Sequence, residues 1–336
     1  MKSRLFFLFF FLIVTYISFS QQRVARHSSG IVTIYSGANP FNDAYVAAVP
    51  GDTLYLPGGP IPSPPTINKR LTIIGAGHYP DSTTATQKTV IGNIVIQQDA
   101  DKLFLEGIEL GAITITLNHK VDSMIITKCK FTSINFQGST SPCMGVLIKN
   151  CVISGDGSFG NTNGLIFSNN IIDGRILSLN NAGISNNIFF YNAISVSAGF
   201  SDVDNCLISN NIFFRNYSGA TYIYSNSELN TFANNIFNVV PNIGSNTFIN
   251  NYNSVNLTSL FVNQTGNIFN YAHDYHLVNP DTYLGNDGNK VGIYGGLYPY
   301  KEGAVPQNPH IQFKIIGTQT NTNGELNIQF KVKAQN

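Results

Sequence analysis

Two aspartates and one arginine are the side chains whose types and spacing come closest to a catalytic group. Asp202 and Asp204 stand two residues apart in SAGFSDVDN, and Arg215 follows in a later loop. Paired carboxylates can hold a cation or act as acid and base at a glycosidic bond, and an arginine can stabilise developing negative charge. Aspartates in loops also commonly hydrogen-bond their own backbone. These three residues are therefore low-ranking candidates, and the sequence assigns no catalytic residue.

Two histidines raise the question of a metal site. His273 and His276 lie in AHDYHL. In a strand, positions three apart project from opposite faces, and we expect no third ligand nearby. We therefore expect both side chains to pack within the last turn of the fold, and no metal ligand is predicted.

The elements that would position these side chains repeat along the chain. Short segments rich in β-branched and aromatic residues recur about every 20 residues, with Asn, Gly and Ser between them. The aligned segments are LEGIEL at 105, ITKCKFT at 126, IKNCVIS at 148, FSNNIID at 167, ISNNIFF at 184 and 208, FANNIFN at 232 and FINNYNS at 248. Such repeats predict a solenoid of strands, in which each turn buries its apolar face against its neighbours.

Three positions of each repeat share one register and are expected to point inward, as in Ile184, Asn187 and Phe189. We place the middle position at a tight corner between two strands, where Asn tolerates a left-handed backbone. Stacked amides at this position would hydrogen-bond along the axis as a ladder. The predicted ladder comprises Asn170, Asn187, Asn211, Asn235 and Asn251.

The order of the motifs adds a resemblance to a known family. GDTLYL at 51, TINKRLTIIGAG at 66 and the repeated I-x-N-N-x-F turns resemble the pectin-lyase-like right-handed β-helix superfamily over roughly residues 51 to 296. The resemblance implies an all-β fold, a right-handed parallel β-helix, which at about 21 residues per coil would have about 11 or 12 coils. It also implies polysaccharide lyases and glycoside hydrolases, whose carboxylate clusters often hold calcium beside a Lys or Arg base.

This chain departs from the pattern of the catalytic members. Its acidic residues between Glu106 and Asn270 are spread over many coils, and GNTNGL at 160 has Asn163 where the hydrolase branch requires a carboxylate. Calcium is the one cofactor that the resemblance suggests, and none is assigned to particular residues.

Both ends of a solenoid need a cover, because open strand edges recruit other chains. Four apolar residues at helical spacing predict a short N-terminal capping helix, namely Phe41, Tyr45, Val46 and Val49. Residues 275–296 are similar to a closing coil. Alternating segments at 310 and 325 flank an Asn323-Gly324 turn and predict a β-hairpin packed near the C-terminal end.

The first residues indicate an export signal. Lys2 and Arg4 precede an apolar run that is too short to span a bilayer, and cleavage is expected after Ser20, an uncleaved anchor being the alternative. Cleavage would leave 17 basic against 18 acidic residues. Without basic clusters, this balance argues against a nucleic-acid partner. The predicted parts are a signal peptide (1–20), a β-helix with its cap (21–298), and a linker with a hairpin (299–336).

The four cysteines include no C-x-x-C pair, which argues against zinc; they are Cys129, Cys143, Cys151 and Cys206. We expect them to be small buried apolar residues. Cys129 and Cys151 occupy one repeat position a coil apart, so a disulfide between them stays open.

Tyrosines near coil corners could stack on sugars, unless they are strand residues with partly buried rings; they are Tyr191, Tyr217, Tyr222 and Tyr224. The sequence thus favours a secreted, periplasmic or cell-surface protein without a transmembrane segment after signal removal. Its expected role is structural or glycan-binding, with a polysaccharide or cell-surface glycan as partner. The alternative is a lyase or glycoside hydrolase acting on acidic polysaccharide.

Overall fold

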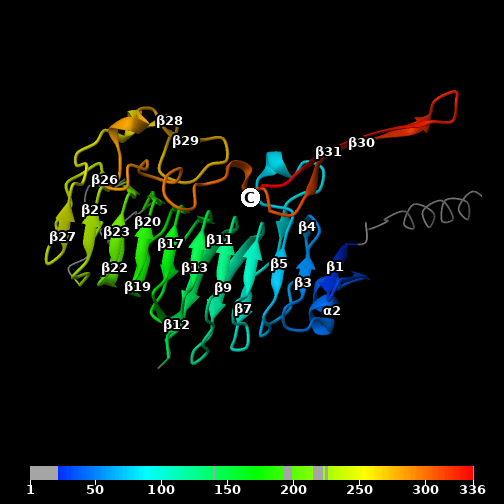
Figure 1. Ribbon diagram of the computed structural model, residues 1–336, viewed down its shortest axis with the longest axis horizontal. Helices are drawn as coiled ribbons and strands as arrows, with labels where there is room; N and C mark the ends of the chain where they lie inside the picture. Colours follow the sequence, from blue (N-terminus) through cyan, green and yellow to red (C-terminus); the bar gives the residue numbers. More distant parts are fainter. Residues whose placement is uncertain (1–21, 139–140, 192–198, 215–221, 224–225, 336) are drawn as a thin grey trace, which may run out of the picture.

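The computed structural model describes residues 22–138, 141–191, 199–214, 222–223 and 226–335. Figure 1 shows an elongated body built from short strands stacked side by side along its length. Within these residues it is a parallel β-solenoid of about 8 turns, with one short helix and a C-terminal antiparallel hairpin. The predicted fold class is therefore confirmed, although about 11 or 12 coils was too many. The predicted leader lies outside the described residues.

One sheet carries the first strand of each repeat, in the order β2-β1-β3-β5-β8-β10-β13-β17-β20-β23-β25-β27. Its parallel strands are β3 (Thr53–Tyr55), β5 (Thr72–Ile74), β8 (Phe104–Glu106), β10 (Ile125–Thr127), β13 (Leu147–Lys149), β17 (Ile166–Ser168), β20 (Gly183–Ser185), β23 (Leu207–Ser209), β25 (Thr231–Ala233) and β27 (Thr247–Ile249). We call this sheet A.

The middle residue of each sheet A strand points into the solenoid. Ile184 pairs with Ile208, and Ile208 pairs with Phe232, in one unbroken register. All three are fully buried, as the repeat predicts. Each such side chain contributes roughly 1.5–3 kcal/mol by leaving water. The column therefore supplies much of the energy that holds neighbouring turns together.

The second sheet, sheet B, follows the main path β22-β19-β15-β11-β14-β18-β21-β24-β26 and also includes β4, β6, β7 and β9. Its strands are β4 (Gly59–Pro60), β6 (Thr89–Val90), β7 (Ile94–Ile96), β9 (Glu109–Ile115), β11 (Lys130–Phe136), β14 (Val152–Ile153), β15 (Gly157–Ser158), β18 (Ile171–Ile172), β19 (Ile176–Asn180), β21 (Ile188–Phe189), β22 (Phe200–Asp204), β24 (Ile212–Phe213) and β26 (Ile236–Phe237). A small pair, β12 (Cys143–Met144) and β16 (Thr162–Asn163), lies apart from both sheets.

A sharp corner joins the two sheets in each turn. The corner residue has a left-handed backbone, with φ of 57° at Asn169, 59° at Asn186 and 58° at Asn210. We expected this conformation one residue later, at the predicted ladder position, and that placement was wrong. The left-handed residue turns the chain, so that the residue after it points inward.

Inside the corner, side-chain amides of successive turns meet. The Nδ2 groups of Asn170, Asn187, Asn211 and Asn235 each donate to the Oδ1 of the asparagine one turn on, at 3.1, 2.9, 3.0 and 3.0 Å, the last acceptor being Asn251. Each of these acceptors also takes the backbone N–H of the preceding asparagine at 2.8–2.9 Å. The structure thus brings all five side chains of the predicted ladder into one column.

The N-terminal end carries an antiparallel hairpin that the sequence did not predict. β1 (Arg23–Ser28) pairs with β2 (Ile31–Ser36) and with β3. The helix α2 (Pro40–Ala47) buries Phe41 and Tyr45, as expected. Val46 and Val49, however, are 68% and 54% exposed. The helix ends at Ala47 and buries only one stripe, so these two valines do not take part in the cap.

After β27 the chain leaves the stack instead of forming further coils. It passes through η2 (Leu257–Ser259), then β28 (Phe261–Asn263) and β29 (Asp274–Leu277), which pair antiparallel. These elements cover outward-facing apolar residues of sheet B, and the cluster includes Ile171, Ile188, Ile212, Ile236, Leu257, Phe261, Tyr275 and Ile293. The closing coil expected over 275–296 is therefore wrong, because this stretch packs on the outside of the solenoid.

The chain then runs back along the corners toward the N-terminal end. We call residues 283–312, which include η4 (Glu302–Ala304), the return segment. Gly292 N donates to Asn210 O at 2.8 Å, and Asn169 Nδ2 donates to Ile293 O at 2.7 Å. Farther on, Thr84 Oγ1 donates to Gln312 O at 2.8 Å. Later residues of the return segment thus contact earlier turns of the solenoid.

The C-terminal hairpin consists of β30 (His310–Thr320) and β31 (Leu326–Lys333). It projects past the N-terminal half of the body (Figure 1). Its existence was predicted, but the expected packing near the C-terminal end of the solenoid was wrong. The return segment carries the chain back before the hairpin begins.

The cysteines, and those of the four tyrosines that the structure describes, are buried. All four cysteines are buried and free, so Cys129 and Cys151 form no disulfide. Tyr191 and Tyr222 are only 2% and 3% exposed and cannot offer a sugar-stacking surface, whereas Tyr217 and Tyr224 fall outside the described residues. No helix in the described part of the chain combines the length and apolar character needed to cross a bilayer.

Candidate functional site

The aspartates singled out in the sequence do not form a site in the described structure. Asp202 lies in the middle of β22 and Asp204 at its end, so both belong to sheet B and not to a loop. Asp202 Oδ1 accepts a hydrogen bond from Asn226 Nδ2, and Asp204 Oδ1 accepts from Glu228 N at 2.7 Å. Both carboxylates thereby link their turn to the next one. Arg215 falls outside the described residues.

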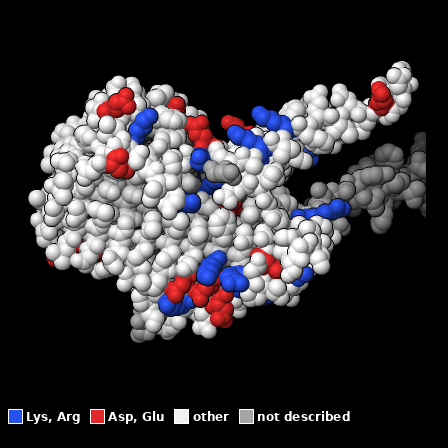
Figure 2. All heavy atoms as spheres, viewed as in Figure 1, with Lys and Arg blue, Asp and Glu red and all other residues white. Residues whose placement is uncertain are grey.

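Charged side chains gather elsewhere. Figure 2 shows them beneath the lower ends of the strands and around the base of the C-terminal hairpin, while much of the remaining surface carries neither charge. The hairpin base is where the return segment crosses the outer face of sheet A. A cavity of about 300 Å³ lies between them.

This cavity, which we call the lysine pocket, is lined by sheet A on one side and the return segment on the other. Thr127 and Lys149 are paired neighbours on β10 and β13, and Lys128 occupies the left-handed corner after β10. Tyr298 and Lys301 come from the return segment. Three ammonium groups therefore surround one cavity. Two of these lysines occupy repeat positions that accept polar residues, since Lys149 points outward from β13 and Lys128 lies at a corner.

A buried ion pair forms one end of this arrangement. Lys128 Nζ lies 3.3 Å from Glu106 Oε1, and the two side chains are 5% and 0% exposed. Burial raises the pKa of Glu106, and Lys128 opposes that shift. Burial also lowers the pKa of Lys128, and Lys149 and Lys301 add to this effect. Glu106 thus holds Lys128 against the two other lysines, and Lys128 Nζ also donates to Val305 O at 3.0 Å and to Gln335 O.

Lys149 is held by an aromatic ring. Its Nζ lies 4.3 Å from the centre of the Tyr298 ring. Desolvation by burial lowers the pKa of Lys149, with Glu106 acting in the opposite direction. Ammonium groups attract ring faces, so Tyr298 fixes this lysine over the cavity.

Two buried polar atoms of the pocket lining have no hydrogen-bond partner in the described structure. They are Thr127 Oγ1 and Asn150 Oδ1. A buried polar atom without a partner costs roughly 1–3 kcal/mol. Both atoms are buried within the lining, so the lysine ammonium groups are what the pocket can offer to an anionic ligand.

A second cavity of about 410 Å³ lies near Phe214 and the loop 264–267. The described residues that line it carry no charge. This cavity is larger than the lysine pocket, but its described lining has no charged side chain that could bind an ionic ligand.

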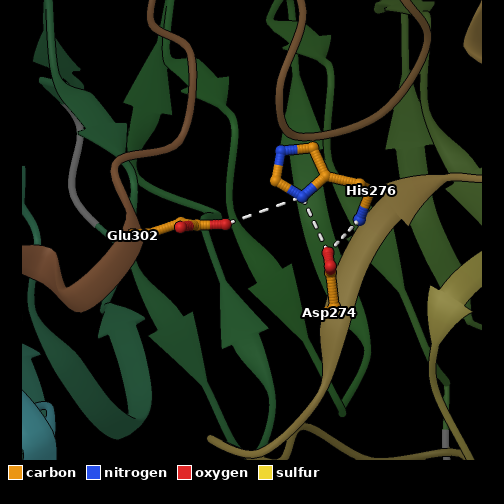
Figure 3. A group of neighbouring side chains, drawn as sticks. All are labelled: Asp274, His276 and Glu302. Carbon is orange, nitrogen blue, oxygen red and sulfur yellow. Dashed lines mark hydrogen bonds and ion pairs between the residues drawn. The ribbon is translucent and has the colours of Figure 1, made fainter.

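A separate group can hold a metal ion. Asp274 and His276 lie on β29, and Glu302 begins η4. His276 Nδ1 is 2.7 Å from Asp274 Oδ1 and 3.6 Å from Glu302 Oε1 (Figure 3). From the sequence we expected no third ligand near His276, and that prediction was wrong, because the return segment brings Glu302 beside it. His273 instead lies near Tyr275 Oη and Thr265.

We did not predict the lysine pocket from the sequence, although the repeats contain a signal for part of it. The aligned segments read FSNN and ISNN in the later turns, but ITKC and IKNC in the two earlier ones. Lys128 and Lys149 thus interrupt a pattern of Ser and Asn. Nothing in the repeat indicates Tyr298 or Lys301, which come from another part of the chain.

Comparisons with known proteins place few limits on this chain. No protein-family model and no curated protein matches its sequence. Among solved structures, it is similar to the PL6 family alginate lyase AlyGC, with a TM-score of 0.32 and 13% sequence identity. The match covers 62% of this chain and only 39% of that enzyme's chain.

Proposed function

We propose that this protein binds an acidic polysaccharide through the lysine pocket. The observation that carries the proposal is the convergence of Lys128, Lys149 and Lys301 on one cavity, with Glu106 as the neighbouring carboxylate. The excess positive charge favours a ligand that carries carboxylate or sulfate groups. A glycan is the favoured class because Tyr298 places an aromatic ring beside these ammonium groups, and aromatic rings suit sugar faces.

We further propose that this activity lies outside the cytoplasm, either in a secreted protein or at the cell surface, because the first residues of the sequence predict an export signal. Extracellular acidic polysaccharides would be accessible there. The calcium that the family resemblance suggested is not needed at the lysine pocket, since lysines already supply positive charge.

Calorimetric titration with defined oligosaccharides tests the proposal. We expect uronic-acid oligomers to bind and neutral oligomers of the same length not to bind, with binding that weakens as salt is added. The double variant Lys149→Ala and Lys301→Ala should weaken binding by roughly tenfold or more, corresponding to about 1.4 kcal/mol. Lys314→Ala removes an exposed lysine of the hairpin and is the matched control. Equal binding of neutral and acidic oligomers would rule the proposal out.

One observation favours a second candidate function, that of a polysaccharide lyase. A lysine whose pKa is lowered by burial, such as Lys149, is suited to remove a proton, and Tyr298 lies against it. Incubation with uronic-acid polymers distinguishes the two functions, because elimination creates an unsaturated product that absorbs ultraviolet light. Product release that is lost in Lys149→Ala would favour the lyase, and binding without product favours the glycan-binding function.

A further inference from the structure

Asp274, His276 and Glu302 bring three metal-ligating atoms to one place. Their ligand atoms all lie within 4.8 Å of one another. Figure 3 shows the two carboxylates directed at the same ring nitrogen of His276, with Asp274 and His276 on one strand and Glu302 on a different segment. We propose that these three residues bind a divalent transition-metal ion of the zinc class.

The donor set selects the class of metal. An imidazole nitrogen with two carboxylate oxygens suits zinc, cobalt or manganese ions, which accept mixed nitrogen and oxygen ligands. Calcium takes oxygen ligands and needs six to eight of them, so a histidine site disfavours it. Two carboxylates also neutralise the charge of a divalent ion.

Neighbouring groups fix the ligands before any ion binds. The His276 ring stacks on Tyr294, with ring centres 3.7 Å apart and planes 6° apart. Tyr294 Oη donates to Glu302 Oε1 at 3.5 Å. One tyrosine of the return segment therefore orients both the imidazole and one carboxylate. Contacts of this kind, made to the ligands by other residues, commonly hold metal ligands in place.

The site joins two separate parts of the chain, so metal binding would fasten the return segment to β29. Asp274 and His276 belong to β29, in the stretch that leaves the stack after β27, whereas Glu302 belongs to the return segment. An ion bound only in the folded state raises the free energy of unfolding, and the gain grows with the logarithm of the ratio of free ion concentration to Kd once the site is nearly saturated. This site stands on its own residues and does not depend on the proposed glycan-binding function.

Titration of the tag-free protein, treated first with a chelator, tests the site. We expect one zinc ion per chain by calorimetry, a higher melting temperature with zinc than with calcium, and visible absorption bands when cobalt replaces zinc. His276→Ala and Glu302→Gln should each weaken zinc binding by about tenfold or more. His273→Ala is the matched control, because it removes a nearby histidine outside the group.

Three results would overturn the proposal. They are the absence of saturable zinc binding, zinc binding that both variants retain at full strength, and equal loss of binding in His273→Ala. Glu302 is 68% exposed, so Glu302→Gln should fold normally and keeps the test clear if His276→Ala is unstable. Oligosaccharide binding measured on the same variants is a separate readout, and its failure would leave the metal result intact.

Discussion

The side-chain amide of Asn211 donates to the side-chain oxygen of Asn235 at 3.0 Å, and both residues are fully buried. Asn211 Nδ2 also donates to Ile184 O at 2.9 Å, and its Oδ1 accepts from the backbone and side chain of Asn187 at 2.8 and 2.9 Å. One amide thus satisfies polar groups in the turns before and after its own. These groups have no access to water, so they depend on one another.

Replacing Asn211 by Ala should therefore lower the free energy of unfolding by about 1–3 kcal/mol, because the partners stay buried without hydrogen bonds. Urea denaturation followed by circular dichroism measures the change. Asn253→Ala alters an exposed asparagine and should shift stability by less than about 0.5 kcal/mol. Identical denaturation midpoints for the two variants would show that the amide column adds nothing to stability.

Removing one partner of the Glu106–Lys128 pair should cost more. Glu106→Gln keeps the shape of the side chain but leaves a buried ammonium without its carboxylate, and we expect a loss of about 3–5 kcal/mol. The double variant Glu106→Leu with Lys128→Met removes both charges and should regain most of that loss. Thermal unfolding of the three proteins checks the order. A double variant less stable than Glu106→Gln would contradict this account.

Asp173 should make stability depend on pH. Burial raises the pKa of its carboxyl to about 6, while Phe269 N donates to it at 2.9 Å. The folded protein then binds a proton that the unfolded chain releases near its ordinary pKa of about 4, so stability falls as pH rises between these two values. Asp173→Asn removes this dependence and keeps an acceptor for Phe269. We expect the variant to gain stability relative to the parent at pH 7, by on the order of 1 kcal/mol, and not at pH 4. A gain of equal size at both pH values would assign the effect to something other than ionisation.

The Tyr298 ring should contribute to oligosaccharide affinity. Tyr298→Leu removes the ring face that holds Lys149. We expect affinity for acidic oligomers to fall about fivefold, which corresponds to the roughly 0.5–1 kcal/mol that such ring contacts contribute. Tyr298→Phe keeps the ring and should bind almost as the parent does. Fluorescence or calorimetric titration measures both. Equal weakening in Phe and Leu variants would shift the role to the hydroxyl group.

The sequence predicts the interior of this protein well because the interior repeats. Ile184, Ile208 and Phe232 recur at one spacing, and parallel stacking places residues of equal register above one another. Our prediction put the left-handed corner one residue too late. Positions 186 and 187 are both Asn, so the sequence alone does not show which of them has the left-handed backbone.

The outside of the protein could not be predicted in the same way. The lysine pocket needs residues near 300 to meet residues far earlier in the chain, such as Lys149, and the metal-ligating group needs Glu302 to lie beside His276 of β29. The contacts of the return segment do not repeat at a fixed spacing. Corner asparagines such as Asn169 bond to the backbone of the return segment, and backbone contacts do not require particular side chains there.

The return segment also limits how this protein can change in evolution. Ordinary solenoids lengthen or shorten by gaining or losing whole repeats. Here Asn186 and Asn169 each contact a set stretch of the returning chain, through Gly292 and Ile293. A turn added or deleted between two such contacts would move one of them by a repeat relative to the other. The number of turns is therefore tied to the length of the return segment, and gain or loss of a whole repeat would need a matching change in that segment.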